Sequence, residues 1–257
     1  MQIKILDCTL RDGGYVNNWD FTNTEISKII KSLEVSSVDI VECGYIDDKK
    51  GLESNSTIFD SIDTVDKLID ENNNSSKVIM INFGDYDISK LPLKKDTKID
   101  GIRLAFHKKN LEEALNLGKQ INDLGYKLYF QPMVTKNYRD IEFLSMIESV
   151  NNLSPYAFYI VDSFGSMTLN EFNRYLVLAD NNLDKNISLG YHSHNNMQLA
   201  FSNAISMCNH NFNRDIIIDS SIYGIGRGAG NLNTELISDY LNSSLGENYN
   251  TLPLLEI

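Results

Sequence analysis

The feature that most constrains this chain is a regular alternation of two kinds of segment. Short runs rich in β-branched and aromatic residues recur, and each is followed by a stretch with helical periodicity, which is typical of β-α-β units around a parallel sheet. The runs are Ile3–Leu10, Val38–Tyr45, Lys77–Gly84, Gly101–His107, Lys127–Val134, Ala157–Phe164, Ile187–His194 and Asp215–Tyr223. Eight strands with helices between them in about 250 residues predict a (β/α)8 barrel, the TIM-barrel fold. A doubly wound open sheet is the alternative.

Start and stop signals support the helices between these runs. Thr22-x-x-Glu25 and Thr168-x-x-Glu171 fit the capping box, and each is followed by apolar residues at helical spacing. A third helix is expected after Asn110, ending at Gly125, because glycine readily adopts the left-handed conformation that terminates helices. These signals predict where three of the surrounding helices begin.

No change of composition marks a domain boundary, so we expect one domain over residues 1–257. Short polar patches, such as residues 71–76 and 181–182, are predicted to be loops. The chain has 35 Asp and Glu against 23 Lys and Arg, a net charge of −12. Such a charge opposes binding to phosphate backbones and anionic lipid, so neither nucleic acid nor a membrane surface is expected as a partner.

Cysteine usage and hydropathy indicate the cellular compartment of the protein. Cys8, Cys43 and Cys208 lie far apart and form no C-x-x-C pair, so neither a disulfide framework nor a zinc knuckle is expected. No stretch approaches the ~18 uninterrupted apolar residues of a membrane span, and the first residues do not resemble a signal peptide. We therefore expect a cytoplasmic protein.

In a (β/α)8 barrel, chemistry lies at the carboxyl ends of the strands. The first run leads into Asp7-Cys8-Thr9-Leu10-Arg11-Asp12-Gly13-Gly14-Tyr15, which by itself fits a polar turn equally well. The seventh run ends in His192-Ser193-His194, and residues two apart on a strand point to the same face. Two imidazoles with a carboxylate such as Asp12 suit Mn²⁺, Zn²⁺, Fe²⁺ or Mg²⁺; the alternative is two polar residues that line a wet barrel end.

Further polar residues stand at the other strand ends. The eighth run passes into a glycine-rich turn, residues 224–231, which fits neither the P-loop nor the G-x-G-x-x-G pattern, so we reject a nucleotide site. This glycine-rich turn either lets the backbone approach a ligand, with Arg227 and Asn231 as polar groups, or is an ordinary flexible loop. The remaining polar strand-end residues are Glu42, Arg103, His107, Asp162 and Ser163. Each of these also fits a structural ion pair or an exposed strand end.

Four motifs occur in order on the first, second, seventh and eighth runs. They are Asp7-x-Thr9-Leu10-Arg11-Asp12-Gly13, Glu42, His192-x-His194-Asn195 and Gly230-Asn231. Together they resemble the DRE-TIM metallolyase superfamily, which includes 3-hydroxy-3-methylglutaryl-CoA lyase, 2-isopropylmalate synthase and 4-hydroxy-2-oxovalerate aldolase. The resemblance covers most of the chain and implies the same barrel fold.

The resemblance implies a divalent metal ion held by Asp12, His192 and His194, with Asn231 as a further ligand in some members. Mn²⁺ or Mg²⁺ is expected, with Zn²⁺ or Co²⁺ as alternatives. These ions stabilise the negative charge that develops on a ketone oxygen when the neighbouring carbon–carbon bond is cleaved or formed.

The same resemblance gives Arg11 the role of stabilising the enolate oxygen, and Glu42 that of orienting Arg11 or the metal ligands. The stretch 162–165 is similar to the Asp-Ser-Ala-Gly segment of the 4-hydroxy-2-oxoacid aldolases, where it lies beside the oxoacid. We therefore expect a metal-dependent carbon–carbon lyase that acts on a 2-oxo acid and an aldehyde or ketone, through a metal-stabilised enolate of the pyruvate type. Arg103 and Arg227 are the candidates for binding a carboxylate or phosphate.

The sequence departs from the aldolases at the general base. Tyr15 stands where they carry a proton-shuttling histidine, and a phenol is normally protonated at neutral pH. Tyr15 can serve as the base if the metal or Arg11 favours its ionised form, and His107 is the alternative.

Two other functions stay open. One is a Claisen-type synthase that condenses an acyl-CoA with a 2-oxo acid, although the synthases usually have Gln at the position of Tyr15. The other is a metal-binding homologue that has lost catalysis and serves a regulatory role. The resemblance also implies a homodimer, because related proteins are commonly dimers. Because the chain stops at Ile257, soon after the last expected helix, docking to the dehydrogenase partner of the oxovalerate aldolases is not expected.

Overall fold

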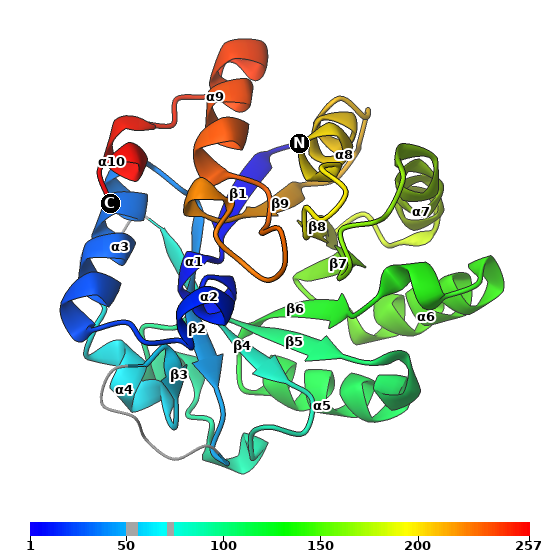
Figure 1. Ribbon diagram of the computed structural model, residues 1–257. Coiled ribbons are helices and arrows are strands. Elements are labelled where there is room, and N and C mark those ends of the chain that lie inside the picture. Colours follow the sequence, from blue (N-terminus) through cyan, green and yellow to red (C-terminus); the bar gives the residue numbers. More distant parts are fainter. Residues whose placement is uncertain (50–55, 71–74) are drawn as a thin grey trace.

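Eight parallel strands close into a barrel. The computed structural model describes residues 1–49, 56–70 and 75–257. Around the barrel the strands follow the order β1-β9-β8-β7-β6-β5-β4-β2, and β2 pairs again with β1. Figure 1 shows the strands enclosed by helices. The predicted (β/α)8 barrel is confirmed, and the open sheet is excluded because the pairing of β1 with β2 closes the ring.

Each predicted run overlaps one barrel strand, and β2 and β4 each extend one residue beyond their runs. The strands are β1 (Ile3–Asp7), β2 (Ile40–Ile46), β4 (Ser76–Asn82), β5 (Gly101–Phe106), β6 (Lys127–Pro132), β7 (Ala157–Asp162), β8 (Ser188–Ser193) and β9 (Ile216–Ser220). The first strand ends earlier than expected because residues 9–12 turn into the short helix α1 (Thr9–Asp12). The two-residue strand β3 (Ile58–Phe59), which extends the sheet beside β2, was not predicted.

The expected capping boxes are present. In α3 (Asn23–Val35), the Thr22 side chain accepts from the Glu25 amide at 3.2 Å, and the Glu25 carboxylate accepts from the Thr22 amide at 2.7 Å. Thr168 and Glu171 make the same pair of bonds at the start of α7 (Leu169–Asn182). These bonds satisfy backbone N–H groups that the helix itself leaves unpaired.

The connection between β4 and β5 departs from the prediction. It contains two 3-10 turns, η1 (Ile88–Lys90) and η2 (Lys94–Asp96), in place of an α-helix. Pro92 between them lacks the N–H that a helix needs and favours an extended residue before it. The remaining elements are α2 (Gly14–Asn17), α4 (Ile62–Asp66), α5 (Leu111–Asp123), α6 (Asp140–Leu153), α8 (Ala200–Cys208), α9 (Thr234–Leu245), α10 (Leu252–Leu255), η3 (Lys108–Asn110), η4 (Thr135–Asn137) and η5 (Ile222–Gly224).

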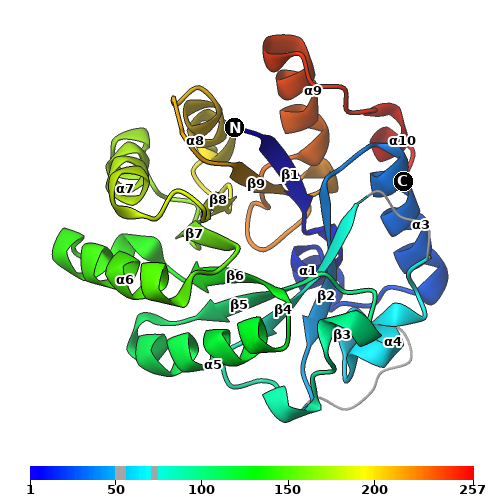
Figure 2. The ribbon, with the colours of Figure 1, turned by 180° about the vertical axis from the view of Figure 1, so that it is seen from behind.

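Of the two polar patches predicted as loops, residues 71–74 lie outside the described residues, and 181–182 are the last two residues of α7. At the other end of the chain, α10 packs beside α3, as Figure 2 shows. The Asn250 amide donates to the Ser36 carbonyl at 3.1 Å, which ties this C-terminal segment to the residue that follows α3.

The buried residues form two layers. An outer apolar layer lies between the strands and helices and includes Leu33, Ile121 and Leu241. A smaller inner layer lies inside the barrel and includes Leu6 and Tyr159. Because neighbouring residues on a strand point to opposite faces, the strands β1, β2, β4, β6, β7 and β9 contribute to both layers.

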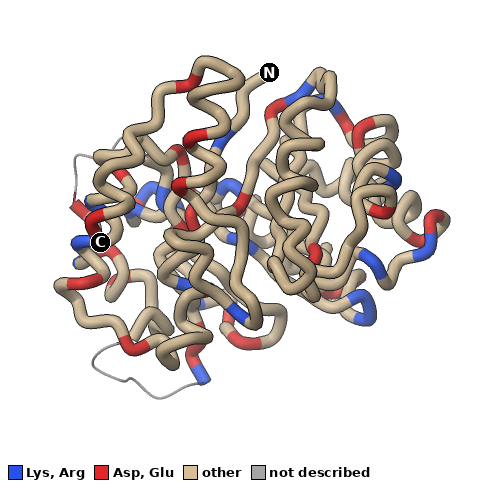
Figure 3. The backbone as a smooth tube through the Cα atoms, turned by 45° about the horizontal axis from the view of Figure 1, so that its top comes forward, with Lys and Arg blue, Asp and Glu red and all other residues tan. Residues whose placement is uncertain are grey.

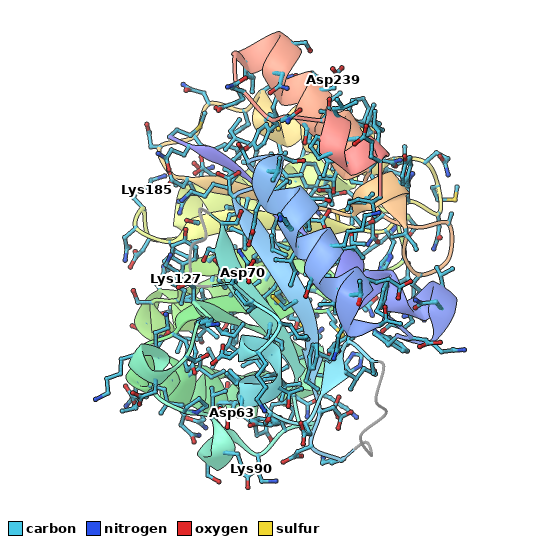
Figure 4. All side chains as sticks on the ribbon, turned by 90° about the vertical axis from the view of Figure 1, so that its left-hand side faces the viewer. Asp63, Asp70, Lys90, Lys127, Lys185 and Asp239 are labelled. Atoms are coloured by element: carbon cyan, nitrogen blue, oxygen red, sulfur yellow. The ribbon has the colours of Figure 1, made fainter. Side chains whose placement is uncertain are left out.

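Charged side chains are spread over the outside of the barrel. Figure 3 shows acidic and basic positions interspersed, and in Figure 4 the exposed Lys90, Lys127 and Lys185 lie at the periphery. Within the part of the chain that the structure describes, no helix combines the length and apolarity needed to cross a membrane.

Candidate functional site

A cavity of about 570 Å³ opens at the carboxyl ends of the barrel strands. This is the end of the barrel at which (β/α)8 enzymes carry their chemistry. Its lining is Arg11, Asp12, Tyr15, Tyr45, Met80, Asn82, Phe83, Asp85, Ala105, Phe106, His107, Asn110, Gln131, Met133, Val134, Val161, Ser163, Phe164, His192, His194 and Arg227. The predicted motifs of the first, seventh and eighth runs therefore meet in one cavity.

Three buried metal-ligating groups meet at one side of this cavity. One ligand atom each from Cys8, Asp12 and His192 lies within 4.8 Å of the other two. The Asp12 carboxylate is 3.4 Å from Nε2 of His192 and 3.7 Å from Sγ of Cys8. The helical turn α1 places Cys8 and Asp12 on the same side by their spacing of four residues. Cys8 was not expected among these groups.

His194 and Asn231 lie next to this cluster. The rings of His192 and His194 are 5.4 Å apart, as expected for two residues on one face of the strand. The Asn231 amide nitrogen donates to Asp12 at 2.7 Å. Nδ1 of His194 and Oδ1 of Asn231 are buried and have no hydrogen-bond partner among the described residues. Buried polar atoms are rarely left unpaired, so both are available to a bound group.

The protonation of the cluster suits a metal ion. Burial alone would raise the pKa of Asp12, but the neighbouring Arg11, with both histidines, lowers it to about 2. Burial lowers the pKa of His194 to about 4. A carboxylate and a neutral imidazole are the forms in which these side chains bind metals.

Behind the cluster lies a buried charge network. Asp219 accepts from Nδ1 of His192 at 2.9 Å, and Glu42 accepts from Nε of Arg11 at 2.8 Å. Arg103 joins both carboxylates: its Nη1 is 2.7 Å from Glu42, and its Nη2 pairs with Asp219. A carboxylate on the far nitrogen of a metal-binding histidine fixes its tautomer and directs the other nitrogen at the metal.

The charges of this region favour a cation. With formal charges, the guanidinium groups of Arg11 and Arg103 face the carboxylates of Asp12, Glu42 and Asp219, which leaves one negative charge buried. A bound divalent ion would compensate it and occupy the unpaired donor atoms. The residues present therefore fit a divalent metal ion, although the oxygen, nitrogen and sulfur donors do not select one metal.

A family model described as HMGL-like matches residues 2–244. The chain belongs to the HMGL-like family. The predicted resemblance to the DRE-TIM metallolyases is thereby confirmed.

Curated relatives of this HMGL-like chain include enzymes named 4-hydroxy-2-oxovalerate aldolase. The one from Bacillus cereus is 22% identical over 237 residues, which cover 91% of this chain and 68% of the relative. The one from Thermomicrobium roseum is 26% identical over 252 residues, which cover 93% of this chain and 66% of the relative.

Two solved structures resemble the barrel. The N-terminal domain of a candidate aldolase from Bacteroides vulgatus superposes with a TM-score of 0.82 at 29% identity, covering 98% of this chain and 84% of that one. The HMG-CoA lyase of Bacillus subtilis has a TM-score of 0.75 at 16% identity, covering 99% and 90%, and supports the fold alone.

The structure brings most other predicted site residues of this HMGL-like chain to the cavity. Tyr15, His107, Ser163 and Arg227 line it. The Tyr15 hydroxyl is 3.5 Å from that of Tyr45, and the Arg227 guanidinium lies 5.8 Å from the Tyr15 ring centroid. Glu42 does not line the cavity and accepts from Nε of Arg11.

Two predicted substrate-binding residues do not line the cavity. Arg103 is fully buried and engaged by Glu42 and Asp219, so the structure places it in the charge network. Asp162 accepts from the backbone amides of Ser166 and Met167 at 3.1 and 2.9 Å, which shapes the loop after β7.

Asp219 was not expected from the sequence, although an acid near the end of the apolar run 216–220 is a detectable signal. Several cavity-lining residues were also not expected: Tyr45, Asn82, Asp85, Asn110 and Gln131. These side chains stand at or just after strand ends, where residue type alone does not distinguish a binding residue from an ordinary turn.

Proposed function

We propose that this HMGL-like protein is a metal-dependent carbon–carbon lyase that cleaves or forms the bond beside the ketone of a 2-oxo acid in an aldol-type reaction. The observation that carries this proposal is the Arg11 guanidinium. Its Nε and Nη1 are held by Glu42 and Asp12, while its buried Nη2 has no partner among the described residues. The relatives named 4-hydroxy-2-oxovalerate aldolase support the reaction class.

Aldol cleavage beside a ketone builds negative charge on the ketone oxygen. Since Arg11 lines the cavity and its position is held by two carboxylates, its free Nη2 is a preorganised donor for that oxygen. Removal of one such donor typically lowers the rate by about 10²–10³-fold.

A divalent cation held by Asp12 and His192, with His194, Asn231 or Cys8 as further ligands, would supply Lewis-acid polarisation of the same oxygen. The chain's own contribution is orientation. Asp219 holds the His192 ring through Nδ1 at 2.9 Å.

Arg227 and Tyr15 complete this side of the site. The exposed Arg227 stands at the rim and suits the carboxylate of a 2-oxo acid. The Tyr15 hydroxyl lies beside that of Tyr45, whose ring centroid is 5.8 Å from the Arg11 guanidinium carbon. Tyr15 and Arg11 both belong to the segment that follows β1, whereas His107 follows β5, and we therefore assign the proton transfer at the carbon to Tyr15.

Hydrogen–deuterium exchange tests this proposal without knowledge of the second reactant. Proton NMR follows the C3 protons of pyruvate and 2-oxobutyrate in D₂O, with Mn²⁺ or Mg²⁺ present or chelated. We expect metal-dependent exchange that Arg11→Lys and Tyr15→Phe both suppress. No exchange by the metal-loaded wild type would overturn the proposal, and release of free thiol from acetyl-CoA with a 2-oxo acid would instead identify a Claisen-type synthase.

The general base and the carboxylate-binding residue are tested separately. His107→Ala should leave more exchange than Tyr15→Phe; the reverse order would transfer the role of base to His107. Arg227→Ala should raise KM for the oxo acid with little change in kcat, and unchanged kinetics would remove Arg227 from the site.

A further inference from the structure

The cavity has a second wall that the proposed chemistry does not use. The groups that would bind the metal and the oxo acid come from the ends of β1, β8 and β9. In the order around the barrel, β6, β4 and β5 lie opposite these three strands. Asn82 at the end of β4, and Asp85, His107 and Asn110 in the following loops, line that opposite wall.

Four polar side chains of this wall are unengaged, whereas Gln131 of β6 pairs with Arg103. Among the described residues, the side chains of Asn82, Asp85, His107 and Asn110 take part in no hydrogen bond or ion pair. The metal side is different, since Arg11 and Asp12 there are held by protein partners. Four unengaged polar groups on one wall are free to bind a ligand.

The chemistry of this wall indicates which ligand. Amide groups both donate and accept, imidazole can do either, and a carboxylate accepts, which matches hydroxyl groups that also donate and accept. The guanidinium groups that line the cavity, Arg11 and Arg227, belong to the metal side. The negative charge of Asp85 on the far wall would repel an anion there. This wall therefore suits a neutral ligand with a hydroxylated carbon skeleton.

The cavity is large enough for such a ligand in addition to the oxo acid. Its volume of about 570 Å³ lies within the ~300–1,000 Å³ of pockets that enclose drug-sized ligands. A three-carbon oxo acid fills only a part of it. Met133 and Val134, after β6, offer apolar surface to the carbon skeleton of a longer partner.

We propose that the second reactant is a neutral polyhydroxylated aldehyde whose hydroxyl groups bind Asn82, Asp85, His107 and Asn110. This rests on the proposed function. In the condensation, carbon 3 of the oxo acid loses a proton and bonds to the aldehyde carbon, and the aldehyde oxygen gains a proton. Cleavage is the reverse, so no further reactant is consumed.

Matched aldehydes test this proposal. The metal-loaded wild type is assayed for addition of pyruvate to glyceraldehyde against propanal, and to erythrose against butanal. We expect kcat/KM to favour the hydroxylated member by about tenfold or more in each pair, because an analogue without hydroxyls leaves the site's polar groups unpaired. Equal rates, or a preference for the alkyl aldehydes, would overturn it.

Erythrose 4-phosphate tests the charge of the ligand. We expect it to be no better than erythrose; a gain of about tenfold or more would overturn the proposed neutral class and point to the nearby Lys108 and Lys109. The two failures are distinguishable, because deuterium exchange into pyruvate needs no aldehyde. Exchange without a hydroxyl preference rejects only the aldehyde class, whereas absence of exchange rejects the lyase.

Variants locate the hydroxyl site. Asn110→Leu and the shape-conserving Asp85→Asn should each reduce the erythrose-to-butanal ratio about threefold to tenfold, as expected for loss of a hydrogen bond. Asn116→Leu, on the exposed face of α5, is the matched control and should keep the wild-type ratio. Thermal unfolding verifies that each variant folds. Folded variants with an unchanged ratio would overturn the assignment of this wall.

Discussion

The two buried regions of the barrel differ in the kind of side chain that they bury. Between strands and helices, Leu33 and Leu241 are fully buried in apolar surroundings. Inside the barrel, next to the apolar residues of the inner layer such as Tyr159, the side chains of Arg103, Glu42 and Asp219 are buried as deeply but carry charge. Burial of an apolar side chain stabilises a fold, whereas burial of a charge is unfavourable unless partners compensate it. The outer layer thus supplies stability, and the inner layer holds the groups that orient the site.

The largest loss of stability is expected from removing the central cation of the buried charge network. Arg103→Met removes the shared partner of Glu42 and Asp219 and leaves buried carboxylates undercompensated. We expect a loss of about 3–5 kcal/mol in the free energy of unfolding, measured by urea denaturation. A change below about 1 kcal/mol would show that the network does not depend on this guanidinium.

A comparable probe of the outer layer is Leu33→Ala in α3. Leu33 is fully buried, and removal of such a side chain costs about 3 kcal/mol through lost burial and the cavity that remains. Urea denaturation measures this loss. Metal affinity and deuterium exchange per folded molecule should stay at wild-type values, and a parallel loss of either would contradict the division between the two layers.

The role of the buried charges in orienting the metal ligands can be measured apart from their effect on stability. Asp219→Asn keeps the size of the side chain but weakens the acceptor that holds His192. We expect metal affinity to fall about 10–100-fold, measured by titration calorimetry with Mn²⁺. Asp162→Asn, which alters a carboxylate at the end of β7 outside the charge network, is the control and should keep the wild-type affinity. Unchanged affinity in Asp219→Asn would mean that Asp219 does not orient the histidine.

The smallest effect is expected from an ion pair on the outer side. Partial burial acts to raise the pKa of Asp180, but the Arg214 hydrogen bond at 3.0 Å and the charge of Lys185 leave it below its ordinary 3.8. Asp180→Asn should cost about 1 kcal/mol near pH 7.

The pH dependence gives the sign of this contribution. A lowered pKa means that the folded state binds fewer protons than the unfolded state, so the pair stabilises the fold above the ordinary pKa and loses that stabilisation as the pH falls. Urea denaturation between about pH 7 and pH 3 should show the gap between wild type and Asp180→Asn closing at the acid end. The exposed Asp123→Asn is the control, and a gap that widens on acidification would refute the assignment.

Local sequence patterns were sufficient for the barrel and for the first residues of the site. The alternation of segments predicted the eight strands, and Arg11, Asp12, His192 and His194 were found because they stand in short motifs at strand ends. Strand and helix periodicity, and the proximity of strand ends in a parallel barrel, follow from backbone geometry, so they can be read without coordinates.

Only the tertiary structure decided which polar residues support the site. Arg103 pairs with Asp219 across 116 positions, and Arg11 pairs with Glu42 across 31. Such pairs depend on the register of strands and the closure of the ring, which no local pattern encodes. For the same reason Arg103 was expected to bind the substrate but lies in the buried charge network. The sequence by itself determined the barrel and the strand ends at which the candidate site lies; ring closure determined which side chains meet there.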